Sequence, residues 1–388
     1  MSLHNKTFPL IILLFFVAIL LISCGGGSSK LDSYGYTRDF NRSQIADQRT
    51  SISSCLTKGN QEIIRREYIK RINANTIMTP KGGFDPRHYP AEVIASLYSI
   101  GLEFGDEHLI KWAEQQLENL FELIDKNNGY WVWPEQIDGA PTFGELAQSR
   151  LVFSLGLIYK RKPSEKTLRT FNLAYGALDR LPLASVVSSI TQSKYSLPFY
   201  AFHNVHAPTP ISFRSLDPNH DAALAAAYAI ASTIKADKSE VSAALDKSNS
   251  YYKAALDMAG LSCLPLADQP EYVRDCDTRY NSFWLMLMQY SSVVLKQSYG
   301  EHLLQKQFDV IKPNLVKFST RRTYPAVYVG EYPDPIEPML LSVAVAKYCN
   351  DVEWRDYVIM LNAYIEKAGQ DIDKWPAGWL YPKFLVIN

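Results

Sequence analysis

Residues 108–124 read HLIKWAEQQLENLFELI, with apolar side chains every three to four positions and charged side chains between them. This spacing is typical of an amphipathic α-helix that buries one face. A helix richer in small and apolar residues precedes it, beginning near Tyr89, and a short polar turn at residues 105–107 joins the two. The stretch therefore predicts a helix pair, with one buried and one half-exposed member.

The same pairing recurs along the chain. Further helices of the apolar kind are expected to begin near Phe143, Asp217, Arg279 and Pro333. Short polar turns join the partners of a pair at residues 162–164, 236–238, 299–301 and 350–352. Long linkers rich in aromatic residues lead into the next pair, over residues 125–142, 181–216, 260–278 and 319–332. Long ordered loops often carry function, so we expect the linkers to form a functional face.

Apolar inner helices, amphipathic outer helices and long loops on one rim are what an α/α toroid requires. Over residues 60–370 the pattern resembles the incomplete α/α toroids of polysaccharide lyases, uronosyl epimerases and several glycoside hydrolases. The resemblance implies an all-α fold, an incomplete α/α toroid of about five helix pairs, in one domain over residues 31–388. A helical-repeat solenoid is the alternative, but tetratricopeptide repeats are only ~34 residues long and have short loops.

The first thirty residues have the pattern of an export signal. An apolar run, Phe8–Ile22, follows His4 and Lys6 and is shorter than the ~20 residues of a membrane-spanning helix. It ends in Leu21-Ile-Ser-Cys24, which resembles the lipobox of bacterial lipoproteins. The resemblance implies removal of residues 1–23, lipidation of Cys24 and a Gly/Ser tether over residues 24–30. An ordinary signal peptide with a chance cysteine is the alternative.

The lipobox resemblance also implies a location. The acylated Cys24 would anchor the protein in the lipid bilayer of a bacterial cell envelope. Gly25 rather than Asp follows the cysteine, which by resemblance to Gram-negative lipoproteins indicates the outer membrane.

Without Lys6 the mature chain has 39 basic and 40 acidic residues, a net charge of about −1. Non-specific nucleic-acid binding needs a basic face, so no nucleic-acid partner is predicted.

Four further cysteines follow Cys24, and an even number in an exported protein indicates disulfides. The favoured local bridge joins Cys263 and Cys276, which flank a loop rich in Pro and Asp. Cys55 would then pair with Cys349. Reduced, buried thiols are the alternative, since free Cys packs as a small hydrophobe.

An aromatic run in the first long linker is a candidate sugar-binding surface. It contains Tyr130, Trp131 and Trp133. Sugar rings pack their C–H faces on indole rings, and aromatic N–H and O–H groups bond to hydroxyls. The alternative is a hydrophobic anchor for the loop.

The stretch from Tyr195 to Asp221 spans the end of the second long linker and the start of the next expected helix. It holds three of the seven histidines, His203, His206 and His220, together with Tyr200. A base that removes the C5 proton of a uronic acid must accept a proton near neutral pH, as His or Tyr can. We therefore predict His203 or His206 as the base. The histidines and Asp221 are an alternative metal-ligand set, but they complete no standard zinc spacing, so no metal and no cofactor are predicted.

Residues 278–284 resemble the Asn-x-Ser-Tyr-Trp segment of alginate-lyase-like toroids. The resemblance implies that Asn281, together with Arg279, neutralises a substrate carboxylate, a role that such groups can fill. Tyr280 or Tyr200 would be the acid. The family's His before the Ser is absent here, and Phe283 stands in place of its Tyr.

Hydrolysis would instead require two carboxylates ~5–10 Å apart across a cleft. Candidates by position are Glu92, Glu145, Asp221, Glu331, Asp334 and Glu337, of which Glu145, Asp221 and Glu337 are also candidates for binding substrate. Because His, Tyr and Arg cluster more visibly than paired acids, we predict an envelope lipoprotein that binds and modifies a polysaccharide, as a lyase or epimerase rather than a hydrolase. The alternative is a non-catalytic scaffold with protein partners in an envelope or secretion complex.

Overall fold

The structure is a computed structural model. The chain forms two compact units, residues 1–49 and 50–388. The described residues all lie in the second unit: 58, 59, 62, 65, 66, 69, 90–132, 136–137, 140–212, 215–257, 278–297, 326–329 and 332–335. The leader, the tether and all five cysteines lie outside them, so lipidation and disulfide pairing stay predictions. Within these ranges no helix is both long and apolar enough to cross a membrane.

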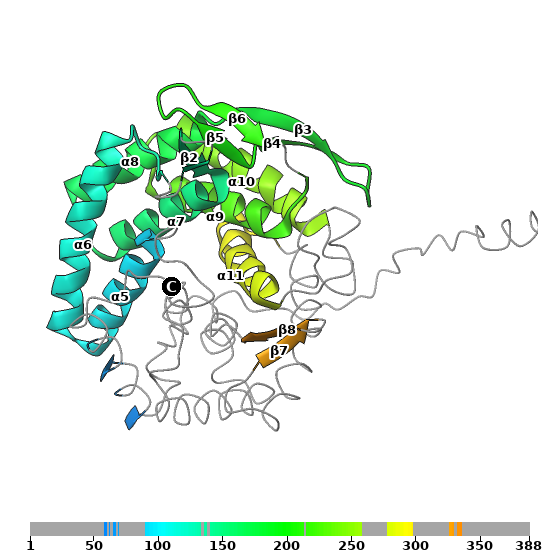
Figure 1. Ribbon diagram of the computed structural model, residues 1–388. Coiled ribbons are helices and arrows are strands. Elements are labelled where there is room, and N and C mark those ends of the chain that lie inside the picture. Colours follow the sequence, from blue (N-terminus) through cyan, green and yellow to red (C-terminus); the bar gives the residue numbers. More distant parts are fainter. Residues whose placement is uncertain are drawn as a thin grey trace, which may run out of the picture. The chain divides into compact units, whose positions relative to one another are not determined.

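The described helices alternate between an inner and an outer row along an arc (Figure 1). Each outer helix packs against an inner one, and neighbouring inner helices pack against each other. The inner row contains α5 (Pro90–Phe104), α7 (Glu145–Arg161), α9 (Pro218–Ile234) and α11 (Thr278–Leu295). The outer row contains α6 (Glu107–Lys126), α8 (Glu165–Asp179) and α10 (Lys238–Asp257). The predicted toroid architecture is therefore confirmed for this part of the chain.

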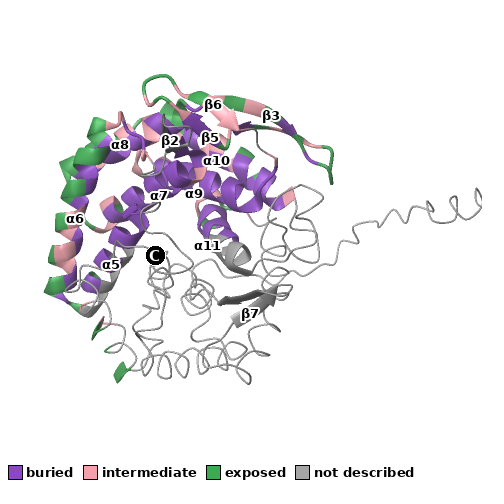
Figure 2. Ribbon diagram, in the orientation of Figure 1, coloured by how far each residue is buried: buried purple, intermediate pink, exposed green. Residues whose placement is uncertain are grey.

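Burial separates the two rows (Figure 2). Helix α9 is buried over its first fourteen residues, Pro218–Ala231. Helix α7 approaches it closely at Gly156, where an added Cβ would come within 2.7 Å of Ile230. Helix α6 instead buries one apolar face and exposes its charged residues, as the 108–124 spacing predicts.

Polar residues begin the helices where the sequence places the turns. The Asp106 carboxylate caps α6 by accepting hydrogen bonds from the N–H groups of His108 and Leu109, at 3.0 and 3.3 Å. Asp217 caps α9, and Pro218 occupies the first turn, where its missing N–H costs nothing. Interactions between residues close in sequence therefore fix where α6 and α9 begin.

Ion pairs connect the outer helix α6 to α8 and to the C-terminal end of α7. Lys166 and Arg169 of α8 pair with Glu118 and with Asp125, the latter at 3.0 Å, and Lys162, the C-cap of α7, pairs with Glu114. All of these side chains are exposed, and the acidic partners follow one another along α6. We call this set the outer ladder.

The first two long linkers form β-strands, which the all-α prediction missed. Strands β1 (Gln136–Ile137), β2 (Ala140–Gly144), β5 (Ala201–His203) and β6 (Thr209–Ser212) make an antiparallel sheet in the order β1-β2-β5-β6. The sheet joins both linkers because Phe143 of β2 lies opposite Phe202 of β5, and both rings are buried with centroids 5.6 Å apart. Strands β3 (Leu183–Val187) and β4 (Lys194–Pro198) form a separate hairpin.

The prediction of a helix beginning near Pro333 is wrong at that position. Residues Tyr332–Pro335 form strand β8, which pairs with β7 (Ala326–Val329). Proline fixes its own φ and disfavours helical backbone in the residue before it, so Pro333 and Pro335 suit an extended segment. The residues after Pro335, including Glu337, lie outside the described part of the chain.

Candidate functional site

Acidic side chains gather where the inner helices begin. Glu92 lies in the first turn of α5, Glu145 is the first residue of α7, and Asp221 lies in the first turn of α9, next to the cap Asp217. All four are buried. The N-terminus of a helix carries partial positive charge, which stabilises carboxylates at these positions. The inner rim therefore holds several buried carboxylates from separate helices.

Glu145 of α7 and His220 of α9 form the centre of this rim. The His220 Nδ1 atom contacts a carboxylate oxygen of Glu145, and both side chains are almost fully buried. The other ring nitrogen, Nε2, lies 3.5 Å from the Asp217 carboxylate. The imidazole is thus held between two carboxylates, one at each nitrogen.

Tyr200 covers this pair from the solvent side. Its ring stacks on the His220 ring with centroids 4.9 Å apart and an interplanar angle of 27°. His220 is only 4% exposed, whereas Tyr200 is 43% exposed. The Tyr200 carbonyl also accepts a hydrogen bond from the Glu145 N–H, at 3.4 Å. An accessible aromatic ring therefore sits directly on a buried histidine–carboxylate pair.

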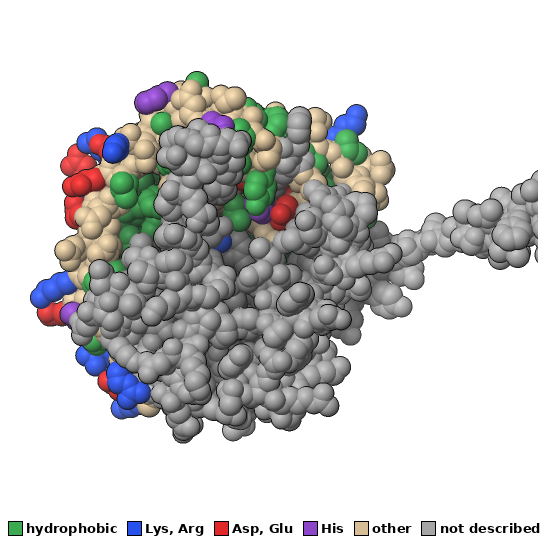
Figure 3. All heavy atoms as spheres, viewed as in Figure 1, with side chains coloured by type: hydrophobic (Ala, Val, Ile, Leu, Met, Phe, Trp, Pro, Cys, Tyr) green, Lys and Arg blue, Asp and Glu red, His purple; other side chains and the backbone are tan. Residues whose placement is uncertain are grey.

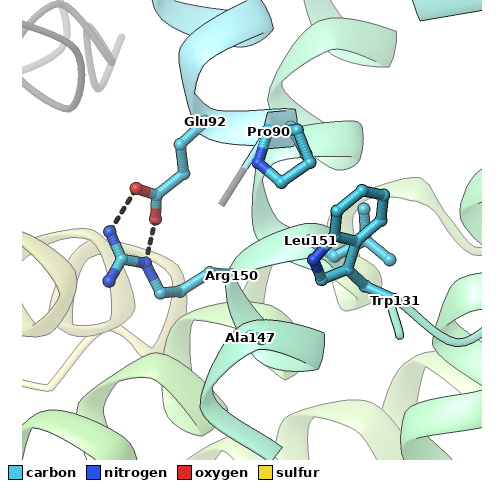
Figure 4. A pocket seen from close by; sticks show the side chains of 7 residues that line it. Pro90, Glu92, Trp131, Ala147, Arg150 and Leu151 are labelled. Atoms are coloured by element: carbon cyan, nitrogen blue, oxygen red, sulfur yellow. Dashed lines mark hydrogen bonds and ion pairs between the residues drawn. The ribbon is translucent and has the colours of Figure 1, made fainter. Parts of the chain in front are cut away.

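A second buried link connects α5 to α7. The Arg150 guanidinium donates two hydrogen bonds to the Glu92 carboxylate, one to each oxygen (Figure 4). Beside the pair is a hollow lined also by Pro90, Ala91, Trp131, Ala147 and Leu151. It is too narrow to take a water molecule, so it is a crevice rather than a ligand pocket.

Trp131 is fixed in this crevice by Gln148. The Trp131 main-chain N–H donates to the Gln148 side-chain oxygen at 3.1 Å. The Gln148 amide nitrogen donates to the carbonyls of Gly129 and Ala174, both at 2.9 Å. Because Gln148 is buried, these bonds hold the aromatic segment rigidly against α7.

Tyr130 belongs to the core rather than to a sugar-binding surface. It is fully buried, and its ring packs against Phe143 with centroids 4.4 Å apart. Burial and desolvation also raise the pKa of its hydroxyl. Trp133 lies outside the described residues. Only Trp131 of the predicted aromatic run is therefore placed near the rim, and it is half-buried.

The three predicted histidines have different surroundings. His220 lies in the buried pair, and His203 is half-buried on β5 opposite Thr142. His206 is exposed in the turn between β5 and β6, where its N–H donates to the Asn204 side chain at 3.1 Å. The described ranges contain no group of three or more His, Cys, Asp or Glu side chains arranged to hold a metal.

Other predicted residues are placed only in part. Asp221 is buried, and its carboxylate accepts the Asp217 N–H at 3.3 Å. Arg279, Tyr280 and Asn281 lie in the first turn of α11, as predicted for an inner helix, but their side chains are outside the described part of the structure. Figure 3 shows histidine and acidic side chains among those of the described residues on one face.

Sequence reasoning missed both buried links. From the sequence, Glu92, Glu145 and His220 are separate candidates, and no pairing among them or with Arg150 is predicted. A signal for them exists: charged residues occur in the first turns of helices that are otherwise apolar almost all round. Such residues must be buried, and buried charges need partners.

Comparison with known proteins supports the fold alone. No protein-family model and no curated protein matches the chain. Among solved structures, cellobiose 2-epimerase from Spirochaeta thermophila DSM 6192 is similar with a TM-score of 0.56 and 11% identity, covering 81% of this chain and 86% of that one. A sugar epimerase from a ruminal bacterium is similar with a TM-score of 0.54 and 11% identity, covering 81% and 87%. The chain has the α/α-toroid fold of these two proteins.

Proposed function

We propose that the protein is a carbohydrate-modifying enzyme that transfers a proton to and from a sugar carbon at the inner rim. The observation that carries this proposal is the buried Glu145–His220 pair beneath the exposed Tyr200 ring. The two similar structures are both named as sugar epimerases, which supports a sugar as the substrate.

The geometry assigns a role to each member of the pair. Because Glu145 contacts Nδ1 of His220, we propose that Nε2, which lies 3.5 Å from the Asp217 carboxylate, turns to a substrate and exchanges a proton with it. Glu145 then orients the imidazole, as a carboxylate does in other histidine-based sites. His220 thus replaces His203 and His206 as the proposed base. Tyr200 must move aside to admit the substrate and can then stack on a sugar face.

Solvent deuterium separates the possible reactions. The protein is incubated in D2O with cellobiose, other disaccharides and uronic-acid polymers, and the products are examined by NMR. Epimerisation predicts deuterium at the inverted carbon, elimination predicts an unsaturated uronide, and hydrolysis predicts new reducing ends without carbon-bound deuterium. Deuterium incorporation that persists in His220→Asn would remove His220 from the mechanism.

Two further variants test the roles within the pair. Glu145→Gln keeps the size of the side chain but removes the charge that orients His220, so we expect a loss of roughly 10²–10⁴-fold in the exchange rate. Tyr200→Phe keeps the stacking ring and should retain most activity. Tyr200→Ala should raise KM more than it lowers kcat.

We also propose that the protein is a lipid-anchored envelope protein, on the basis of the sequence from Lys6 to Cys24. Palmitate labelling in a bacterial host tests this directly. Labelling of the full chain that disappears in Cys24→Ser supports the anchor, and an unlabelled wild-type chain overturns it.

A non-catalytic scaffold is the second candidate. This candidate predicts no turnover of any glycan and a protein partner that co-purifies with the full chain. Deuterium exchange lost in His220→Asn would exclude it.

A further inference from the structure

The Asp217 carboxylate uses its two oxygens for two different contacts. Its Oδ1 accepts the main-chain N–H groups of Asn219 and His220, at 3.1 and 3.4 Å, and so caps helix α9. Its Oδ2 lies 3.5 Å from Nε2 of the His220 ring, which is an ion-pair distance and longer than a good hydrogen bond. The same carboxylate therefore contacts both the main chain and the imidazole of His220.

Neighbouring groups fix the Asp217 carboxylate in this orientation. The Asp217 N–H donates to the Asp221 carboxylate at 3.3 Å, and the Asn219 side-chain amide donates to Oδ1 of Asp217 at 3.3 Å. The Asp217 side chain is only 12% exposed, so solvent screens its charge little. Because a rotation that moved Oδ2 away from the ring would also break the helix cap, the position of Oδ2 is set before any substrate binds.

The groups that face the His220 ring favour its charged form. Glu145 of α7 contacts Nδ1, Asp217 faces Nε2, and the Tyr200 ring, between β4 and β5, stacks on the imidazole. A carboxylate within about 4–6 Å stabilises an imidazolium, and an aromatic face attracts a cation. Helices α10 and α11 also pack against α9. Helix α10 donates a hydrogen bond to Ala225, more than one turn beyond His220, and the first-turn side chains of α11 lie outside the described residues.

We infer that Asp217 is a positioning residue for His220, whose carboxylate holds Nε2 while the site is empty and receives it again once that nitrogen carries a proton. The inference rests on the proposed function. In the forward step a C–H bond of the sugar breaks, its proton bonds to Nε2, and the electron pair stays on the sugar. The imidazolium then lies between the Glu145 and Asp217 carboxylates, which stabilise it. The reverse step returns the proton to the sugar.

Asp217→Asn separates the charge at Nε2 from the helix cap. Asn caps a helix about as well as Asp, so α9 should begin at the same residue. Asp237→Asn is the matched control, because the exposed Asp237 accepts the N–H groups of Ser239 and Glu240 at the start of α10, at 2.8 and 3.1 Å. Asp217→Ser, which also caps without a charge, replaces Asp217→Asn should that variant not fold.

NMR of the full chain with ¹⁵N-labelled histidine reads the protonation of the ring without any need for turnover. The ring-nitrogen signals of His220 are assigned by their loss in His220→Asn. At a fixed pH we expect the ratio of imidazolium to neutral imidazole at His220 to fall about tenfold in Asp217→Asn and to stay unchanged in Asp237→Asn. An unchanged ratio in Asp217→Asn overturns the inference, whether or not the wild type acts on a sugar.

Deuterium exchange into a sugar distinguishes this inference from the proposed function. If both hold, the acidic limb of the exchange rate against pH moves to lower pH by about one unit in Asp217→Asn. A limb that stays in place would show that Asp217 acts only as a helix cap, and would overturn the inference. A lower protonation ratio in Asp217→Asn, with no exchange by the wild type on any sugar, supports the contact between Asp217 and Nε2 and overturns the proposed function.

Discussion

One ion pair joins two inner helices and another joins two outer helices, but the two pairs differ in how far solvent reaches them. Arg150 and Glu92 link α5 to α7 with side chains 7% and 2% exposed, whereas Lys166 and Glu118 link α6 to α8 with side chains 51% and 56% exposed. Solvent weakens the outer pairs, while the inner pair must offset a large desolvation cost. We therefore expect that removing one partner of an outer-ladder pair changes the free energy of unfolding little. Removing one partner of the buried Glu92–Arg150 pair should lower it strongly.

The largest effect is expected when the inner pair is broken on one side. Arg150→Met leaves the Glu92 carboxylate buried without its bidentate partner and should lower the free energy of unfolding by about 3–5 kcal/mol. Chemical denaturation of the variant and the wild type measures the difference. A change below about 1 kcal/mol would show that Glu92 is better solvated than its burial indicates.

The matched control removes both charges. Glu92→Leu/Arg150→Met replaces the pair by apolar groups, and it should recover most of the stability that Arg150→Met loses. If the double variant is as unstable as Arg150→Met, the loss of stability comes from the lost geometry of the pair and not from an unpaired buried charge.

An intermediate effect is expected at the Asp257 latch, the set of hydrogen bonds in which the Asp257 carboxylate at the end of α10 accepts from Ser188, Thr191 and Tyr195. Asp257→Asn replaces an acceptor of three hydroxyl hydrogen bonds by an amide with one acceptor oxygen, at a cost of about 1–3 kcal/mol. Hydrogen exchange should show faster exchange in β3 and β4, with α7 and α9 unchanged. Uniform acceleration would mean that the hairpin is part of the global folding unit.

Tyr195 gives the latch a dependence on alkaline pH. Burial, followed by its hydrogen bond to Asp257, raises the pKa of Tyr195 to about 12, whereas a free tyrosine has a pKa of 10.0. A raised pKa means that the folded state holds the Tyr195 proton more tightly than the unfolded state does. The contribution of Tyr195 to the free energy of unfolding is therefore complete below about pH 10 and is lost as the pH rises through about 12. The loss should be smaller than that in Asp257→Asn, because Tyr195 is only half-buried. Denaturation of wild type and Tyr195→Phe across this range tests it; equal pH slopes would contradict it.

The smallest effect is expected in the outer ladder. Glu118→Gln removes the partner of Lys166 and should change the free energy of unfolding by less than about 1 kcal/mol. The difference should shrink further in high salt, because screening acts on exposed charges. A cost comparable to that of Arg150→Met would remove the distinction between the two rows of helices.

The helix pattern could be predicted because it depends on local sequence. The period of residues 108–124, the short polar turns and the caps Asp106 and Asp217 all act within a few positions of each other. The strands of the linkers could not be predicted in the same way. Phe143 and Phe202 become strand partners only when two linkers meet, and the pattern of either linker alone does not reveal the other.

The candidate site was predicted by position but not by pairing. Glu145, His220 and Tyr200 are separate candidates in the sequence, and the structure brings them together. The sequence could not indicate that Tyr130 points into the core while Trp131 next to it reaches the crevice. The choice depends on Gln148 of α7, which accepts a hydrogen bond from the Trp131 N–H and donates one to the Gly129 carbonyl.

The pairing of β2 with β5 has a consequence for how the protein assembles during synthesis. Thr142 and His203 pair across α7, α8 and the β3–β4 hairpin, so the contact closes a long stretch of chain. Helices and their neighbours form from local contacts first, and distant strand pairs form later. A nascent chain that has emerged only as far as α8 exposes Phe143 without its partner, which makes this segment a place for chaperones to bind before the rim closes.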